Sequence, residues 1–329
     1  MEHAFAQYIR TLGRGKRGMR NLTPEEAECA FGMILDGEAL PMQVGAFLML
    51  LRVKEETGLE LSGFVRAARK RLQVPSVAPA VDLDWSSYAG KRRQLPWFLL
   101  SALLLAQNGV RVFMHGLNKR ADERVYTPEA LAALGIAPSA SLADAANALT
   151  QHNFAFCALE SFSPQLAELI ALRSTLGLRS PVNSLARMLN PFSATHVIQG
   201  IFHPPYKMIH LEAGTLLGIP HLAVLKGEGG EIERNPDVPC EVATLHDGVQ
   251  STEAWPALFA LRHVKDETMD VARLPALWRG DLKDEYGEAA VVGTAAVALK
   301  LLQRADTTET AQALAQQWWG QRNKNEMFS

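Results

Sequence analysis

The sequence predicts an α/β protein in which a small helical domain precedes a larger domain with a mainly parallel central sheet. Two observations support this. Up to about residue 75 the apolar residues recur at helical spacing, and from residue 80 short apolar runs alternate with helical segments. Such alternation is typical of parallel strands with helices on both faces. With 329 residues, 48% of them hydrophobic, the chain can form one large domain or two unequal ones.

Capping signals place the first helices. Thr23, Pro24 and Glu26 combine an N-cap, a residue suited to the first helical turn and a capping box. A second helix is expected to begin at Pro41, and a third to cover 62–72 from a cap at Ser62. Residues 75–79 form a proline-bounded linker. The expected boundaries are a helical domain over 1–75 and an α/β domain over 80–329.

The α/β part is expected to start with a strand at 80–84. Further strands are expected at 110–115, 154–159, 197–202 and 221–226, and helices at 96–108, 128–134, 164–176, 205–217 and 287–303.

Composition restricts the class of protein. The three cysteines, Cys29, Cys157 and Cys240, are far apart, which argues against a zinc ribbon or a disulfide framework and favours a reducing cytoplasm. The N-terminus shows no signal-peptide pattern, and the apolar runs are too short to span a bilayer. We therefore expect a cytoplasmic protein without a membrane partner.

Basic residues gather in two places, although the net charge is −2. The first place is an N-terminal run with three glycines, and its basic residues are Arg10, Arg14, Lys16, Arg17 and Arg20. The second is Lys91-Arg92-Arg93, between an expected strand and an expected helix, where α/β sheets bind ligands. Such side chains can follow a phosphate backbone without reading sequence. The alternative for both is an ordinary solvated basic loop.

Three further features leave alternatives open. His115, at a strand end before Gly116, suits a substrate or phosphate contact or a structural role. The acidic residues Glu228, Glu231 and Glu233 suit either Mg²⁺ or a solvated turn. Trp85 and Tyr88, beside the basic loop, could stack on unpaired bases, although core packing is the commoner role.

Several motifs together resemble anthranilate phosphoribosyltransferase. They are Leu-Thr-Pro-Glu-Glu-Ala at 22–27, Ile-Leu-Asp-Gly-Glu at 34–38, His-Gly-Leu-Asn-Lys at 115–119, Leu-Arg-Ser-Thr-Leu-Gly-Leu-Arg at 172–179, and residues 227–233. The resemblance implies a discontinuous helical domain, to which a segment near 178–191 returns, and a homodimer formed through that domain. It also implies a substrate-pocket remnant made of Tyr88, Gly90, His115, Gly116, Asn118 and Arg173, of which Arg173 matches the family's aromatic-acid-binding arginine.

The chain departs from the family's pattern at three places. Lys91-Arg92-Arg93 replaces a glycine-rich phosphate loop, and residues 119–124 lack the usual serine/threonine-rich run. Ile232-Glu233 replaces an aspartate-glutamate pair, which leaves a metal site at Glu231 and Glu233 in doubt. One branch, the YbiB-like group, resembles the transferase in fold but binds nucleic acid, and this chain is similar to that branch.

The resemblance therefore implies a non-enzymatic homodimer that binds nucleic acid without sequence preference, with single-stranded DNA or RNA preferred and no cofactor required. The expected contacts are Arg10, Arg14, Lys16, Arg17, Arg20, Lys91, Arg92, Arg93, Lys119 and Arg120. The alternative is an active phosphoribosyltransferase that uses Mg²⁺, phosphoribosyl pyrophosphate and anthranilate or another nitrogenous acceptor. The remnant pocket could also keep a small anionic ligand.

Overall fold

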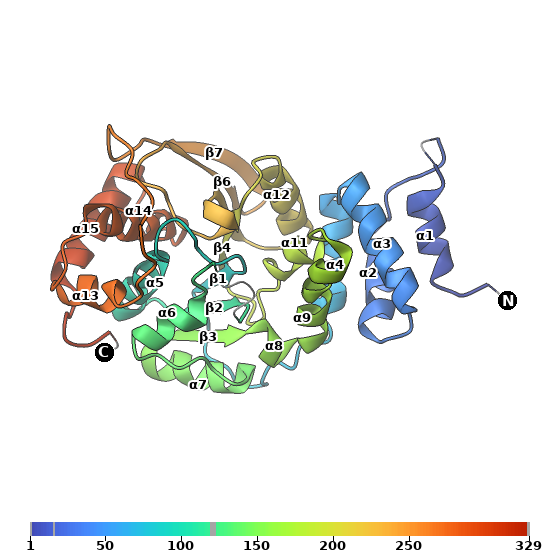
Figure 1. The fold of residues 1–329 in the computed structure, drawn as a ribbon, viewed down its shortest axis with the longest axis horizontal. Coiled ribbons are helices and arrows are strands. Elements are labelled where there is room, and N and C mark those ends of the chain that lie inside the picture. Colours follow the sequence, from blue (N-terminus) through green and yellow to red (C-terminus); the bar gives the residue numbers. More distant parts are fainter. Residues whose placement is uncertain (1, 16, 119–122, 328–329) are drawn as a thin grey trace.

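A small helical part stands beside a large α/β part, which confirms the expected fold class (Figure 1). The computed structural model describes residues 2–15, 17–118 and 123–327. Within these residues, no helix combines the length and the apolar character needed to cross a membrane. Cys29, Cys157 and Cys240 are free thiols.

Four helices build the first part: α1 (Ala6–Gly13), α2 (Pro24–Leu35), α3 (Pro41–Lys54) and α4 (Gly58–Arg69). The capping box at the start of α2 is confirmed, since Thr23 and Glu26 each accept a hydrogen bond from the other's backbone N–H. The expected start of the third helix at Ser62 is wrong. The helix begins one turn earlier, under a capping box formed by Thr57 and Glu60, and the Ser62 hydroxyl donates to a carbonyl inside the helix.

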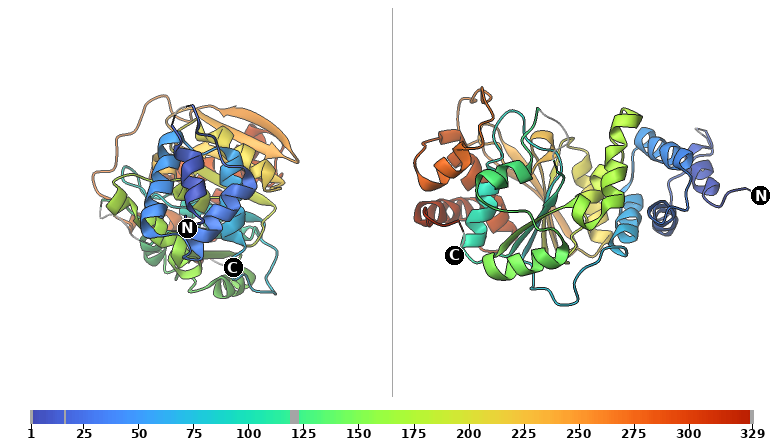
Figure 2. Two further views of the ribbon diagram at one scale, coloured as in Figure 1. Left: turned by 90° about the vertical axis from the view of Figure 1, so that its right-hand side faces the viewer. Right: turned by 60° about the horizontal axis from the view of Figure 1, so that its bottom comes forward.

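A later segment of the chain returns to this helical part. It contains α8 (Leu159–Phe162), α9 (Pro164–Ala171), α10 (Arg173–Leu176) and α11 (Val182–Ala186). Arg69 at the end of α4 donates hydrogen bonds of 2.8 and 2.9 Å to the carbonyl oxygens of Leu189 and Met188, and so joins α4 to this segment. Figure 2 shows the helical part beside one end of the sheet.

The sheet has seven strands in the order β3-β2-β1-β4-β5-β6-β7. The strands are β1 (Leu83–Ser87), β2 (Val112–Gly116), β3 (Phe154–Ala158), β4 (His196–Ile201), β5 (His221–Lys226), β6 (Cys240–His246) and β7 (Val249–Trp255). The first five are parallel, whereas β6 and β7 are antiparallel. The first strand lies three residues later than expected, and the β6–β7 hairpin was not expected at all.

Helices cover both faces of the sheet (Figure 2). The buried helices α5 (Phe98–Gln107) and α14 (Glu285–Leu301) pack with one face of the strands, and α15 (Thr308–Gln321) packs on α14. The other apolar cluster joins the opposite face to α12 (Tyr206–Leu216) and the helical part. The remaining helices are α6 (Thr127–Ala133), α7 (Leu142–His152) and α13 (Arg273–Arg279). The loops that follow the parallel strands β1, β4 and β5 therefore meet at one edge.

Candidate functional site

The loop between β1 and α5 lies at the carboxyl edge of the sheet, as expected for a phosphate-binding segment. Gly90 has a φ of +66°, and a Cβ there would lie 3.1 Å from the ring of Tyr126, so the position favours glycine. Lys91 exchanges two backbone hydrogen bonds of 2.9 and 2.8 Å with Val125. These contacts fix the loop against the segment that follows β2.

The backbone N–H groups of this loop are already bound by carboxylates of the same chain. We call residues 228–233 the acidic turn; it begins with the short helix η1 (Glu228–Gly230). Glu231 accepts from the N–H groups of Ala89 and Gly90 at 2.5 and 2.7 Å. Glu228 accepts from the N–H groups of Arg92 and Arg93 at 3.1 and 3.0 Å. The acidic turn thus takes up the donors that a phosphate would need.

Lys91 does not lie where we expected a phosphate contact. Its side chain is 2% exposed, and its ammonium lies 2.5 Å from a Glu233 oxygen and 3.1 Å from a Glu228 oxygen. Burial opposes the charge, but Glu233 and Glu228 outweigh it and raise the pKa of Lys91. Lys91 is therefore an internal ion-pair partner, because the acidic turn folds over it.

The doubtful metal site at Glu231 and Glu233 does not fit the geometry. One Glu233 oxygen binds Lys91, and the other accepts from the N–H of Phe98 at 2.9 Å. Glu231 is fully buried, with one oxygen bound to two N–H groups. Among the described residues, no group of three or more acidic, histidine or cysteine side chains could hold a metal ion. Mg²⁺ prefers several free oxygen ligands, which these carboxylates do not offer.

Arg92 and Arg93 differ from Lys91. Both are exposed, and no ion pair among the described residues engages either guanidinium group. Their backbone N–H groups are held by Glu228, so the side chains project from a fixed loop. Two of the three expected cations in this loop are thus available to an external anion.

The N-terminal basic residues are exposed but only partly unpaired. Arg10 forms an ion pair with Glu2, and Arg20 with Glu26, whereas Arg14 and Arg17 have no ion pair within the described residues. Lys16, Lys119 and Arg120, which we also expected to contact nucleic acid, lie outside the described residues. In Figures 1 and 2, α1 lies on the far side of the helical part from the sheet. One chain therefore keeps the N-terminal run apart from Arg92 and Arg93.

The expected pocket remnant includes a buried polar chain. The hydroxyl of Tyr88 lies 2.7 Å from Nδ1 of His115, whose Nε2 lies 3.2 Å from an Asp84 oxygen. His115 and Asp84 are fully buried, and Tyr88 nearly so. This chain holds the end of β1 against β2, so His115 has a structural role. Tyr88 and Trp85 are both buried, which is wrong for stacking on bases.

The other expected pocket residues lie nearby. A Cβ at Gly116 would meet the Ser87 carbonyl oxygen at 1.9 Å, so β1 and β2 approach too closely there for another residue. Asn118 is exposed, and its N–H donates to Glu160 at 3.3 Å. Arg173 is exposed on α10 and contributes positive charge to the neighbouring Arg179.

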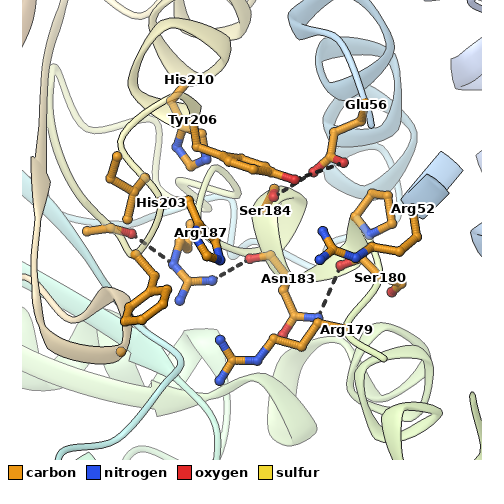
Figure 3. A pocket seen from close by; sticks show the side chains of 15 residues that line it. Arg52, Glu56, Arg179, Ser180, Asn183, Ser184, Arg187, His203, Tyr206 and His210 are labelled. Atoms are coloured by element: carbon orange, nitrogen blue, oxygen red, sulfur yellow. Dashed lines mark hydrogen bonds between the residues drawn. The ribbon is translucent and has the colours of Figure 1, made fainter. Parts of the chain in front are cut away.

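Sequence reasoning missed three arginines around this edge. Arg124 donates to the carbonyl oxygens of Ala89 and Gly90 at 3.1 and 2.9 Å. Arg179 and the buried Arg187 line a separate cavity between the helical and α/β parts (Figure 3). The only sequence signal was basic residues within a segment that returns to the helical part.

Family models match two parts of the chain. The helical bundle domain of a glycosyl transferase family matches residues 6–72, and its a/b domain matches residues 98–320. The chain belongs to this glycosyl transferase family. Within the family, the chain is 33% identical to an anthranilate phosphoribosyltransferase of Nitratidesulfovibrio vulgaris over 74% of this chain and 71% of the relative. It is 30% identical to protein YbiB of Escherichia coli over 70% of this chain and 73% of that protein.

Solved structures show the same fold across almost the whole chain. The anthranilate phosphoribosyltransferase of Thermus thermophilus superposes with a TM-score of 0.81 at 24% identity, covering 97% of this chain and 94% of that one. The enzyme of Saccharomyces cerevisiae in complex with PRPP and Mg gives a TM-score of 0.79 at 17% identity, covering 98% and 95%. The fold of this glycosyl transferase family member is thus that of anthranilate phosphoribosyltransferase.

Proposed function

We propose that this protein binds nucleic acid without sequence preference, on a phosphoribosyltransferase scaffold that no longer carries out the transfer. The observation that carries the proposal is the division within one loop. The acidic turn takes up the loop's backbone donors and Lys91, while Arg92 and Arg93 extend into solvent. No cofactor is needed for such binding, and free thiols suit a cytoplasmic location.

Release of pyrophosphate requires donors and metal that stabilise the leaving charge. Here Glu231 and Glu228 compete for four backbone donors of the loop, and Glu233 is paired with Lys91. An incoming pyrophosphate would have to displace these carboxylates and leave them close to its own charge. Like charges at short range oppose each other, which disfavours binding of phosphoribosyl pyrophosphate.

A polymer of phosphates needs less from the loop. Long guanidinium side chains can contact successive phosphates on the outside of the fold, without entry into the occupied site. Arg14 and Arg17 would supply further contacts from the N-terminal run. Because one chain separates the two basic regions, the proposal includes a homodimer through the helical part, which would offer both regions twice to one strand.

The test is the double variant Arg92→Ala/Arg93→Ala in a gel shift with short single-stranded DNA and RNA. Binding should weaken equally for all sequences, and the dependence of log affinity on log salt should fall by about 2, roughly one for each lost phosphate contact. The matched control is Arg279→Ala/Arg304→Ala, which removes two exposed arginines outside the proposed surface. Unchanged affinity in the loop variant, or equal loss in both, would show that the loop is not the contact.

The second candidate function is phosphoribosyl transfer to anthranilate or another nitrogenous acceptor. The comparisons favour this function more directly, because the relative at 33% identity is named as that enzyme. Loss of anthranilate fluorescence with phosphoribosyl pyrophosphate and Mg²⁺ would reveal it. Turnover that Arg173→Ala abolishes would support transfer and contradict a purely binding function.

A further inference from the structure

A second place in the molecule gathers positive charge without a matching acid. Arg52 and Glu56 from α3, the segment from Arg179 to Arg187, and the start of α12 with Tyr206 surround a cavity of about 110 Å³. We call it the arginine cavity (Figure 3). Since a water molecule takes up about 30 Å³ in the liquid, the cavity can hold a group of several non-hydrogen atoms.

Three guanidinium groups line this cavity: those of Arg52, Arg179 and Arg187. Burial and neighbouring guanidinium groups, including that of Arg187, lower the pKa of Arg179 to about 10. No ion pair among the described residues joins any of the three to a carboxylate. Like charges held together out of water are costly unless an anion neutralises them.

The single acid that lines the arginine cavity is engaged elsewhere. Glu56 is 3% exposed, and its oxygens accept from the Ser184 hydroxyl at 2.8 Å and the Tyr206 hydroxyl at 3.5 Å. Burial raises the pKa of Glu56, which weakens its negative charge further. The lining of the arginine cavity is therefore net positive.

Arg187 is held in position by the backbone. Its Nε donates to the Gly200 carbonyl oxygen at 3.0 Å and its Nη1 to the Asn183 carbonyl oxygen at 2.6 Å, while Nη2 has no hydrogen bond within the described residues. A guanidinium group fixed in this way loses little entropy when it binds an oxyanion. Phosphate monoesters carry up to two charges and suit several arginine donors at once.

We propose that the arginine cavity binds one phosphate monoester group. Two kinds of molecule can carry this group, a small phosphorylated metabolite or the terminal phosphate of a nucleic acid strand. The site is separate from Arg92 and Arg93, so it can exist whether or not the loop binds nucleic acid.

The first experiment titrates ribose 5-phosphate and inorganic phosphate into the full-length protein at low ionic strength, by calorimetry and by thermal unfolding. Both probes should bind saturably and raise the melting temperature. Arg179→Gln and Arg52→Gln should each weaken binding of ribose 5-phosphate at least tenfold. Without phosphate, both variants should unfold at or above the wild-type temperature, because they remove a like charge. Arg92→Ala/Arg93→Ala should leave this binding unchanged.

A second arm distinguishes the two carriers. A strand-end ligand requires that an oligonucleotide with a 5′-phosphate bind more tightly than its 5′-hydroxyl form, and that Arg179→Gln remove this preference. A metabolite ligand requires ribose 5-phosphate binding with no such preference. The inference is overturned if neither ribose 5-phosphate nor the phosphorylated oligonucleotide binds saturably above uncharged controls. It is equally overturned if Arg179→Gln and Arg52→Gln leave their binding unchanged.

Discussion

Lys91 illustrates what a single residue's neighbours decide. In the sequence it is one of three consecutive cations, and nothing local separates it from Arg92 and Arg93. In the fold its ammonium pairs with Glu233, which lies 142 residues later in the chain. Local patterns locate the loop, but they carry no information about which side chain a distant turn will cover.

The buried ion pair predicts a large effect of Lys91→Met on stability. Removal of the ammonium leaves Glu233 and Glu228 without their cation in a buried site, which should lower the free energy of unfolding by about 3–5 kcal/mol. Urea denaturation measures this change. Arg92→Met, at the exposed neighbouring position, should stay within about 0.5 kcal/mol of wild type. A loss as small for Lys91→Met as for Arg92→Met would contradict the pairing.

The elements differ in how much of them the sequence revealed. Thr23 and Pro41 announce α2 and α3, because capping and proline signals act within one turn. The β6–β7 hairpin was missed, although its turn, Asp247-Gly248, carries a strong local signal. Both residues have positive φ, as a two-residue hairpin turn requires. The exposed, polar β7 hid that signal, because it lacks the apolar alternation of a strand.

The middle of the sheet also predicts a pH effect. His196, His221 and His246 are aligned across β4, β5 and β6, with ring centroids 4.8 and 5.2 Å apart. Burial and the charge of His221 lower the pKa of His196 and His246 below the ordinary value of 6.5. The unfolded chain therefore binds protons first as pH falls below about 6.5, so the free energy of unfolding should decrease there.

Urea titrations between about pH 7.5 and 5.5 measure this decrease. His246→Gln removes one titrating ring and should make the stability less dependent on pH in this range. The other charged groups near the rings are Asp82, Asp247 and Lys300, and they remain in the variant. The control is His3→Gln, at an exposed position. If His246→Gln and His3→Gln change the pH dependence equally, the aligned histidines are not its source.

At the scale of the whole molecule, the fold class follows from periodicity, whereas the candidate site depends on long-range packing. The alternation after residue 80 was enough to predict a mainly parallel sheet. The arginine cavity was not predictable, because Arg52 and Arg187 reach it from helices far apart in the sequence. Motif resemblance supplied the fold, and only the structure showed that the acidic turn occupies the phosphate loop.

The proposed dimer gives the last prediction. Met42 and Val53 on α3 are 80% and 82% exposed, an unusual exposure for apolar side chains and one that suits a surface covered by a second copy. Met42→Gln/Val53→Gln should shift the protein from dimer to monomer in light scattering without a change of net charge. Affinity for oligonucleotides should fall with it, because a monomer offers each basic region once. Val77→Gln, at an equally exposed linker position, should change neither. A variant that stays dimeric, or a monomer that binds oligonucleotides as tightly as wild type, would separate the helical surface from nucleic acid binding.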